Sequence, residues 1–107
     1  MKNQYVENVC GMLRRKGLSE KYEHPGIYCI KLDGQIVYIG KSQNMLQRVA
    51  AHYVGINTGA ERKYRIIWDA STQLNCPIEF DVLYYAQNTS KEDIVEEIGQ
   101  KEGELIR

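Results

Sequence analysis

Two short runs of β-forming residues, Ile27–Lys31 and Gln35–Ile39, constrain the fold more than any other feature of the chain. A turn-forming segment, Leu32-Asp33-Gly34, separates them, so the pattern predicts a β-hairpin. Both faces of this hairpin are largely apolar, which requires helices on each side of the sheet. The hairpin therefore indicates a small α/β (α+β) domain.

The type of turn decides which side chains share a face of the hairpin. A two-residue turn at 33–34 pairs Cys29 with Tyr38 and sends Tyr28 to the opposite face. A three-residue loop with Gly34 in the left-handed conformation pairs Tyr28 directly with Tyr38. The local pattern allows both turns, so the register stays open at this point.

The spacing of apolar residues predicts four helices around the hairpin and one further strand. The order is αββααβα, with a sheet of about three strands, antiparallel or mixed. In the helix that begins near 44, one stripe is apolar, and Arg48 and His52 lie one turn apart on a neighbouring face. The helices cover residues 3–16, 44–55, 61–74 and 90 to the chain end; the strand covers 78–85, with Ile78, Phe80, Val82 and Tyr84 on one face; the apolar stripe is Leu46, Val49, Ala50 and Tyr53.

The charge of the chain is neutral overall but divided along its length. The chain has 107 residues, room for one domain, with 14 basic and 14 acidic side chains. Residues 1–68 carry 11 basic and 5 acidic groups, a net of +6, and residues 69–107 carry 3 and 9, a net of −6. Neutrality therefore does not exclude nucleic acid as a partner, although we expect weak, strongly salt-dependent binding.

The cysteines and the hydropathy pattern bear on the compartment. Three cysteines without a CxxC motif indicate reduced thiols in the cytoplasm. The chain has no run of 18 apolar residues and no signal-peptide pattern at its start, so we expect an intracellular protein without a membrane partner.

Two tripeptides carry a family resemblance. The segment Pro25-Gly-Ile-Tyr-Cys-Ile, followed by Tyr38-Ile-Gly-Lys-Ser, resembles the start of the GIY-YIG nuclease domain. Arg48 stands at the arginine position of the helix after YIG, and His52 at a position often held by His or Tyr. The ending Glu102-Gly-Glu-Leu-Ile-Arg107 looks like the family's glutamate with its Leu-Ile-basic run.

The resemblance implies the GIY-YIG fold over residues 26–107, with residues 1–25 as an N-terminal helix and linker packed on it. It also requires Tyr28 and Tyr38 in one site, and so selects the three-residue loop that pairs them directly. It implies a metal-dependent endonuclease that hydrolyses double-stranded DNA without an organic cofactor. In the roles it implies, Glu102 holds Mg²⁺ or Mn²⁺, Tyr28 takes a proton from water with help from Tyr38 and Lys41, Arg48 neutralises phosphoryl charge, and His52 supports it.

The chain departs from the family pattern at its end. Family members usually continue past the basic position into a segment with Pro and Asn, whereas this sequence stops at Arg107. The sequence is therefore either a truncated form or a naturally short one, and it does not separate a phage or mobile-element enzyme from a restriction or repair enzyme. Oligomeric state and target specificity are equally out of its reach.

Read without the family, the same residues have structural alternatives. Glu102 falls on the apolar stripe of the last helix, where a carboxylate is costly unless it binds a metal ion or forms a salt bridge, for example to Arg48. Tyr28 is a poor base because the pKa of tyrosine is about 10, so it needs a nearby cation, for which Lys41 is the candidate. Lys41 is as well explained as a surface lysine, and His52 could orient a tyrosine, relay a proton or bind phosphate.

Several further residues are candidates for substrate binding or packing. Gly40 would let the backbone approach a substrate, and Gly99 with Gly103 would let the last helix pack tightly. The basic clusters position a DNA backbone, or they are only solvated helix ends. A non-catalytic nucleic-acid-binding module on the same fold is the alternative function. The basic residues are Arg14, Arg15, Lys16, Arg62, Lys63 and Arg65; the acidic residues read as solvated are Glu92, Asp93, Glu96, Glu97 and Glu104.

Overall fold

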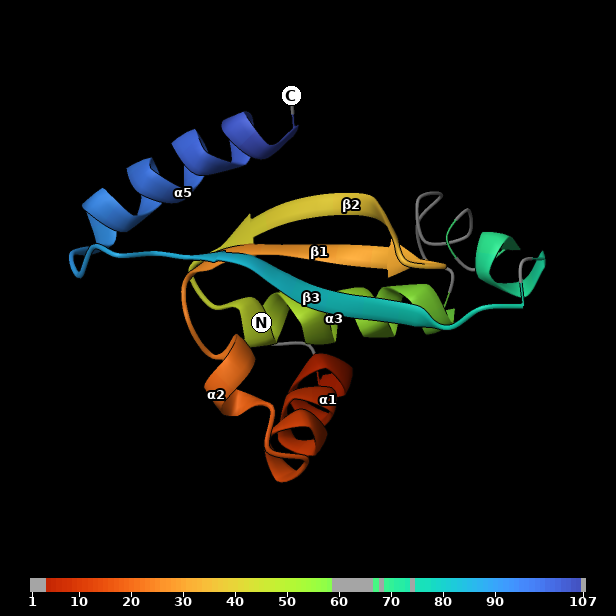
Figure 1. Ribbon diagram of the computed structural model, residues 1–107. Helices are drawn as coiled ribbons and strands as arrows, with labels where there is room; N and C mark the ends of the chain where they lie inside the picture. Colours follow the sequence, from red (N-terminus) through yellow and green to blue (C-terminus); the bar gives the residue numbers. More distant parts are fainter. Residues whose placement is uncertain (1–3, 59–66, 68, 74, 107) are drawn as a thin grey trace.

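Three antiparallel strands form the centre of the molecule, in the order β2-β1-β3 (Figure 1). The computed structural model describes residues 4–58, 67, 69–73 and 75–106. The strands are β1 (Gly26–Leu32), β2 (Gln35–Ser42) and β3 (Ile78–Tyr85). The prediction of a small α+β domain with a three-stranded sheet between helices is confirmed, and the described sheet is antiparallel throughout.

Helices cover the two faces of the sheet (Figure 1). On one face lies α3 (Met45–Thr58), with α1 (Gln4–Arg15) packed against it, and on the other face lies α5 (Lys91–Ile106). The core between α1 and α3 is formed by Cys10, Leu13, Leu46, Val49 and Ala50. A one-turn helix, α2 (Ser19–Tyr22), occupies the segment for which the sequence predicted only a connection.

Local signals set the ends of these helices. Gly17, with a positive φ of 80°, follows the end of α1. The Asn44 side chain accepts the Gln47 N–H at 3.4 Å at the start of α3. Before α5, Ser90 Oγ accepts the Asp93 N–H at 3.3 Å and donates to the Asp93 carboxylate at 2.8 Å.

The predicted helix over 61–74 lies largely outside the described residues. Ile67 and residues 69–73 are helical, and Ile67 is buried. The expectations for Arg62, Lys63, Tyr64, Arg65, Trp68 and Leu74 fall on residues that the structure does not describe.

The predicted apolar stripe of α3 is wrong at one position. Tyr53 is 44% exposed, whereas His52, expected on the face next to the stripe, is only 2% exposed. Helix α3 is rotated so that the imidazole, rather than the phenol, faces the sheet. A buried imidazole needs hydrogen-bond partners, which the site supplies.

The hairpin turn has two residues, so the direct pairing of Tyr28 with Tyr38 is wrong. Asp33 and Gly34 both have positive φ, 52° and 76°, as in a type I′ turn, and Leu32 pairs with Gln35. A β-bulge then shifts the register between Ile30 and Lys31.

Because of the bulge at Val37, the residues of β2 that follow it point to the faces opposite to those that the two-residue turn alone would give them. Lys31 pairs with Ile36 but Ile30 pairs with Tyr38, which leaves Val37 as the extra residue. Without it, the two-residue turn would put Tyr38 on the face away from Tyr28. With it, both tyrosines lie on the α3 face, as the family resemblance requires, through a register that neither turn alone predicts.

A second bulge lies on the other side of β1. Ile27 pairs with Tyr84 and Tyr28 with Val82, so Leu83 is the extra residue on β3. Consequently Tyr84 does not share a face with Phe80 and Val82, as strict alternation predicted, but points to the α5 face.

The described helices are too short or too polar to cross a membrane.

Candidate active site

Three aromatic rings from three elements meet on the α3 face of the sheet. The hydroxyl of Tyr28 on β1 lies 2.6 Å from Nε2 of His52 on α3. Their ring centroids are 5.4 Å apart, and the ring of Tyr38 on β2 is 6.3 Å from Tyr28 and 5.1 Å from His52. The observed geometry favours orientation of a tyrosine, or proton exchange with it, among the three roles left open for His52.

Gly40 makes room for the side chain of Tyr28, a role that the sequence did not indicate. A Cβ at Gly40 would lie 2.4 Å from the Tyr28 hydroxyl and 2.5 Å from Cζ. The Tyr28 ring therefore crosses directly over the backbone of β2. Because β2 is an edge strand of the described sheet, the ring leads the hydroxyl from the centre of the sheet towards that edge.

The environment of Tyr28 keeps its hydroxyl protonated. Burial is the main cause that raises the pKa of Tyr28 above 10, and the neighbouring Tyr38 raises it further. The guanidinium of Arg48 acts in the opposite direction, by charge and by hydrogen bonding. The cation that favours ionisation of Tyr28 is thus Arg48, where the sequence suggested Lys41.

Arg48 itself is exposed at the rim of a surface hollow. The hollow has a volume of about 380 Å³ and lies between α1 and the start of α3. A planar guanidinium in such a position can reach both a buried hydroxyl and a phosphate group. The lining includes one carboxylate, and its residues are Val6, Glu7, Ser42, Gln43, Asn44, Gln47, Arg48 and Ala51.

Lys41 and Glu102 form an ion pair on the opposite face of the sheet. Nζ of Lys41 lies 3.7 Å from Oε1 of Glu102 on α5. The Glu102 side chain is 22% exposed, so it is half-buried and paired, as the salt-bridge alternative expected, although with Lys41 rather than Arg48.

The two groups reach adjacent positions of β2. Tyr28, with His52, Tyr38 and Arg48, approaches Gly40 from the α3 side, and Glu102 approaches Lys41 from the α5 side. The sixth catalytic candidate, Lys41, is thus one of two consecutive edge-strand residues around which the other five gather.

The residues fit only a weakly chelated metal ion. Among the described residues no three His, Cys, Asp or Glu side chains come together as a metal-binding group. Glu102 offers one partly exposed carboxylate, which suits Mg²⁺ or Mn²⁺ because these ions retain water and accept phosphate oxygens. Binding there requires that the ion displace or share the charge of Lys41.

The other candidates for substrate binding are unevenly placed. Arg14 is held by Glu23 through two hydrogen bonds, of 2.9 and 3.3 Å, while Arg15 and Lys16 are exposed. Gly99 and Gly103 do not serve tight packing, since a Cβ at Gly99 would meet only Lys41 at 3.7 Å and one at Gly103 would meet nothing within 4 Å.

Sequence reasoning missed Glu97, which it treated as a solvated charge. Its carboxylate accepts hydrogen bonds from the Tyr84 hydroxyl and from Gln87 and Asn88. No local pattern could have revealed this, because it depends on the bulge that turns Tyr84 towards α5.

The chain matches no family model, and no curated protein or solved structure is significantly similar to it.

Proposed function

We propose that this chain is a metal-dependent DNA endonuclease of the GIY-YIG type, which hydrolyses phosphodiester bonds. The observation that supports the proposal is the convergence on Gly40 and Lys41 described above. A chain that only bound nucleic acid would have no need of a carboxylate at this edge, where it repels phosphate.

Within this proposal, the residues on the α3 face of the sheet carry out the proton transfer. The Tyr28 hydroxyl is in hydrogen-bond contact with Nε2 of His52, and in the tautomer whose Nε2 carries no proton this nitrogen can accept the hydroxyl proton, while Arg48 stabilises the phenolate that results. Because Tyr28 is fully buried in the free protein, its action as a base requires that substrate binding open a path to the hydroxyl. Arg48, already exposed, neutralises the charge that develops on the phosphoryl group.

Glu102 is the residue that would hold the metal ion. When bound, Mg²⁺ or Mn²⁺ supplies positive charge for the scissile phosphate and the leaving oxygen. Lys41, which pairs with Glu102 at the same edge, would contact a phosphate there.

Nicking of supercoiled plasmid in the presence of Mg²⁺ tests the proposal. We expect the wild type to convert plasmid to the open-circular form and Glu102→Ala to lose this activity by at least ~100-fold, since it removes the only protein ligand in the proposed site. Glu104→Gln, which changes an exposed carboxylate two residues away, is the matched control and should retain activity. Equal nicking by the wild type and Glu102→Ala would refute the assignment.

A gel-shift assay with the same DNA distinguishes the alternative function. Retardation of DNA without cleavage across a series of Mg²⁺, Mn²⁺ and Ca²⁺ would replace the nuclease proposal with that of a binding module.

A further inference from the structure

We propose that Glu97 is a positioning residue, which docks α5 on the end of β3 and thereby sets where the Glu102 carboxylate lies. The catalytic part of this inference rests on the proposed nuclease function. The docking part does not, and it can be tested on its own.

The Glu97 carboxylate is surrounded by hydrogen-bond donors. The Gln87 N–H donates to both oxygens, at 2.8 and 3.0 Å, and the N–H and side-chain amide of Asn88 donate at 3.0 and 2.8 Å. The Tyr84 hydroxyl is the remaining donor. These hydrogen bonds link α5 both to the end of β3 and to residues 87 and 88, which precede the helix.

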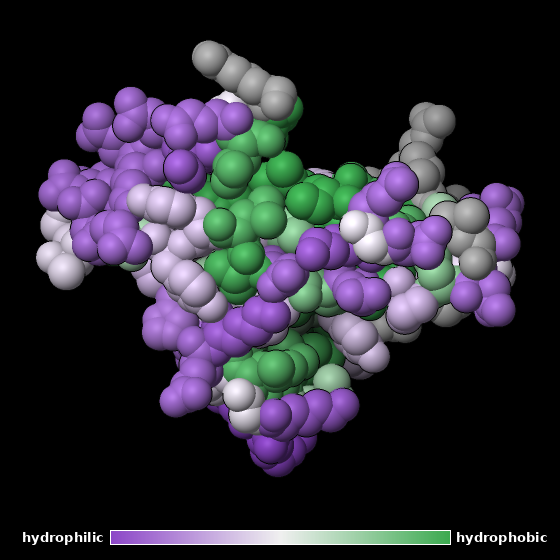
Figure 2. Space-filling view, in the orientation of Figure 1, coloured by the Kyte–Doolittle hydropathy of each residue, from purple (hydrophilic) through white to green (hydrophobic). Residues whose placement is uncertain are grey.

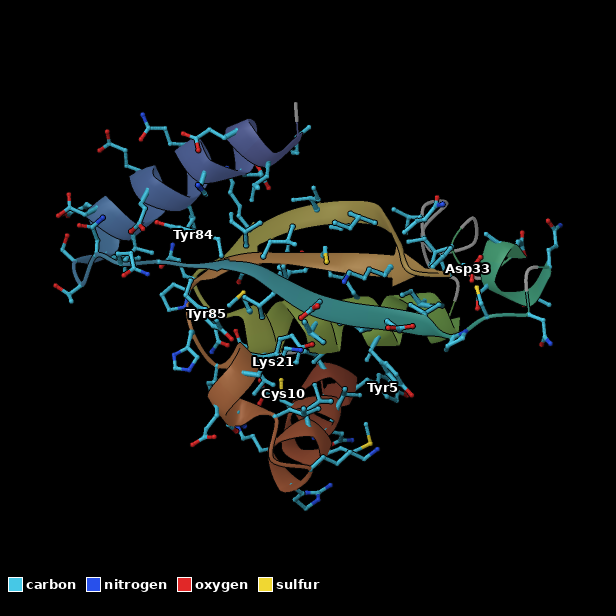
Figure 3. All side chains as sticks on the ribbon, viewed as in Figure 1. Tyr5, Cys10, Lys21, Asp33, Tyr84 and Tyr85 are labelled. Carbon is cyan, nitrogen blue, oxygen red and sulfur yellow. The ribbon has the colours of Figure 1, made fainter. Side chains whose placement is uncertain are left out.

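The sheet is shaped to deliver one of these donors. The bulge at Leu83 turns Tyr84 out of the alternation of β3, so that it lies on the face covered by α5. Figure 3 shows Tyr84 where β3 ends, on the side of the sheet where α5 lies. The bulge thereby places the Tyr84 hydroxyl where it donates to Glu97.

Apolar packing alone holds α5 weakly. Ile98 is the only buried residue described in this helix, and Val95 and Ile106 are 48% and 61% exposed. The outer surface of the helix is strongly hydrophilic (Figure 2). The polar contacts of Glu97 therefore add to this apolar packing in the attachment of α5.

The attachment spans the sheet from one edge to the other. Glu97 is bound at the end of β3, and Glu102, five residues and about 7.5 Å further along the helix axis, reaches Lys41 on β2. Ile98 is buried between them. Loss of the anchor at β3 would let the helix shift, and the carboxylate at the β2 edge would move with it.

Amide hydrogen exchange of residues 98–106 tests the docking. We expect Glu97→Gln, which keeps the size of the side chain but loses its charge and one acceptor oxygen, to speed exchange in this segment by at least ~10-fold through local opening. Glu96→Gln, at the neighbouring exposed carboxylate, should exchange like the wild type. Unchanged exchange in Glu97→Gln would overturn the inference, whatever the nuclease assay shows.

Binding of Mn²⁺, followed by calorimetry, and steady-state nicking test the consequence for Glu102. Loss of an orienting partner of a ligand typically lowers metal affinity by about 10- to 100-fold, and we expect this for Glu97→Gln. Its kcat should fall while its KM for DNA stays constant, because Glu97 contacts no substrate. Wild-type affinity and kcat in a variant whose α5 exchanges faster would overturn the positioning role.

Failure of the nuclease proposal and failure of the docking inference give different results. If the wild type neither nicks DNA nor binds Mn²⁺, the proposed function fails, while the exchange experiment still decides the docking. If Glu97→Gln does not fold, Tyr84→Phe, which removes a single donor, replaces it and should speed exchange by a smaller factor. Its circular dichroism spectrum shows whether it is folded. Wild-type exchange rates in a folded Tyr84→Phe variant would contradict the inference.

Discussion

At Gly40 the space that a side chain would fill is occupied by the ring of Tyr28, and this contact brings the Tyr28 hydroxyl to His52. The requirement is steric rather than conformational. The buried hydrogen bond at 2.6 Å and the backbone of β2 are therefore parts of one packing arrangement.

We predict that Gly40→Ala destabilises the protein by about 1–3 kcal/mol, the usual cost of an added atom in a filled core. The new Cβ would lie 2.4 Å from the Tyr28 hydroxyl, so the ring must move away from His52. Urea unfolding should show a lower midpoint with an unchanged slope. Gly103→Ala, which meets nothing within 4 Å, is the control and should be at least as stable as the wild type. A midpoint for Gly40→Ala equal to that of the wild type would show that the ring is not packed in this way.

The residues of the candidate site could be identified from the sequence, but their partners could not. The tripeptides and their spacing singled out Tyr28, Tyr38, Arg48 and Glu102. The expected pairs were Tyr28 with Lys41 and Glu102 with Arg48, whereas Arg48 acts on Tyr28 and Lys41 pairs with Glu102. These pairings depend on which face of β2 each residue occupies, and the face is set by a bulge that has no signature in the sequence.

Among the elements, the hairpin shows how two local rules combine. The turn at Asp33-Gly34 follows its sequence preference and has two residues, and the extra residue Val37 then restores the face that this turn would have reversed. The length, order and capping of the described helices, by contrast, follow from apolar spacing and short-range hydrogen bonds. They were therefore largely predictable.

Deletion of Val37 should remove the bulge and keep the faces of β2. With Val37 absent, Tyr38 follows Ile36 directly, so Ile36 still lies opposite Lys31 and Tyr38 opposite Ile30. We therefore expect a dispersed NMR spectrum in which Tyr28 and Tyr38 remain in contact. Deletion of both Ile36 and Val37 would instead place Tyr38 opposite Lys31, on the other face, and should abolish cooperative unfolding. Loss of the contact between Tyr28 and Tyr38 in the single deletion would contradict the role of Val37 as the extra residue.

On the scale of the whole molecule, acidic side chains tie peripheral elements to the sheet. Asp81 on β3 binds Lys21 of α2 at 2.9 Å and Lys31 of β1 at 3.3 Å, and Lys21 is the main cause that lowers its pKa to about 2. Hydrogen bonding from Tyr84 and from the backbone of 87–88 lowers the pKa of Glu97 to about 2. The net charge of zero gives no indication of the contacts that these two carboxylates make.

These two groups predict acid instability. A carboxyl whose pKa is lower in the folded state stabilises the protein fully above its unfolded pKa, here 3.8 for Asp81 and 4.5 for Glu97, and less as the pH falls towards about 2. The free energy of unfolding should therefore decline between about pH 4.5 and pH 2. The double variant Asp81→Asn, Glu97→Gln should decline less steeply, as urea titrations at a series of pH values would measure.

Asp33→Asn is the control for this titration, because Asn also tolerates the left-handed conformation of the turn. It should follow the wild-type profile. A double variant as acid-sensitive as the wild type would mean that other groups dominate acid unfolding.

The bulge at Val37 also bears on how molecules of this protein behave towards one another. Strand β2 lies at an edge of the described sheet and exposes Ile36 and Val37 to solvent. A straight apolar edge presents free backbone groups on which a neighbouring chain can add a strand, the first step of aggregation. The irregularity interrupts that edge at its most apolar point, so the residue that brings two tyrosines together inside the molecule also discourages the growth of the sheet beyond it.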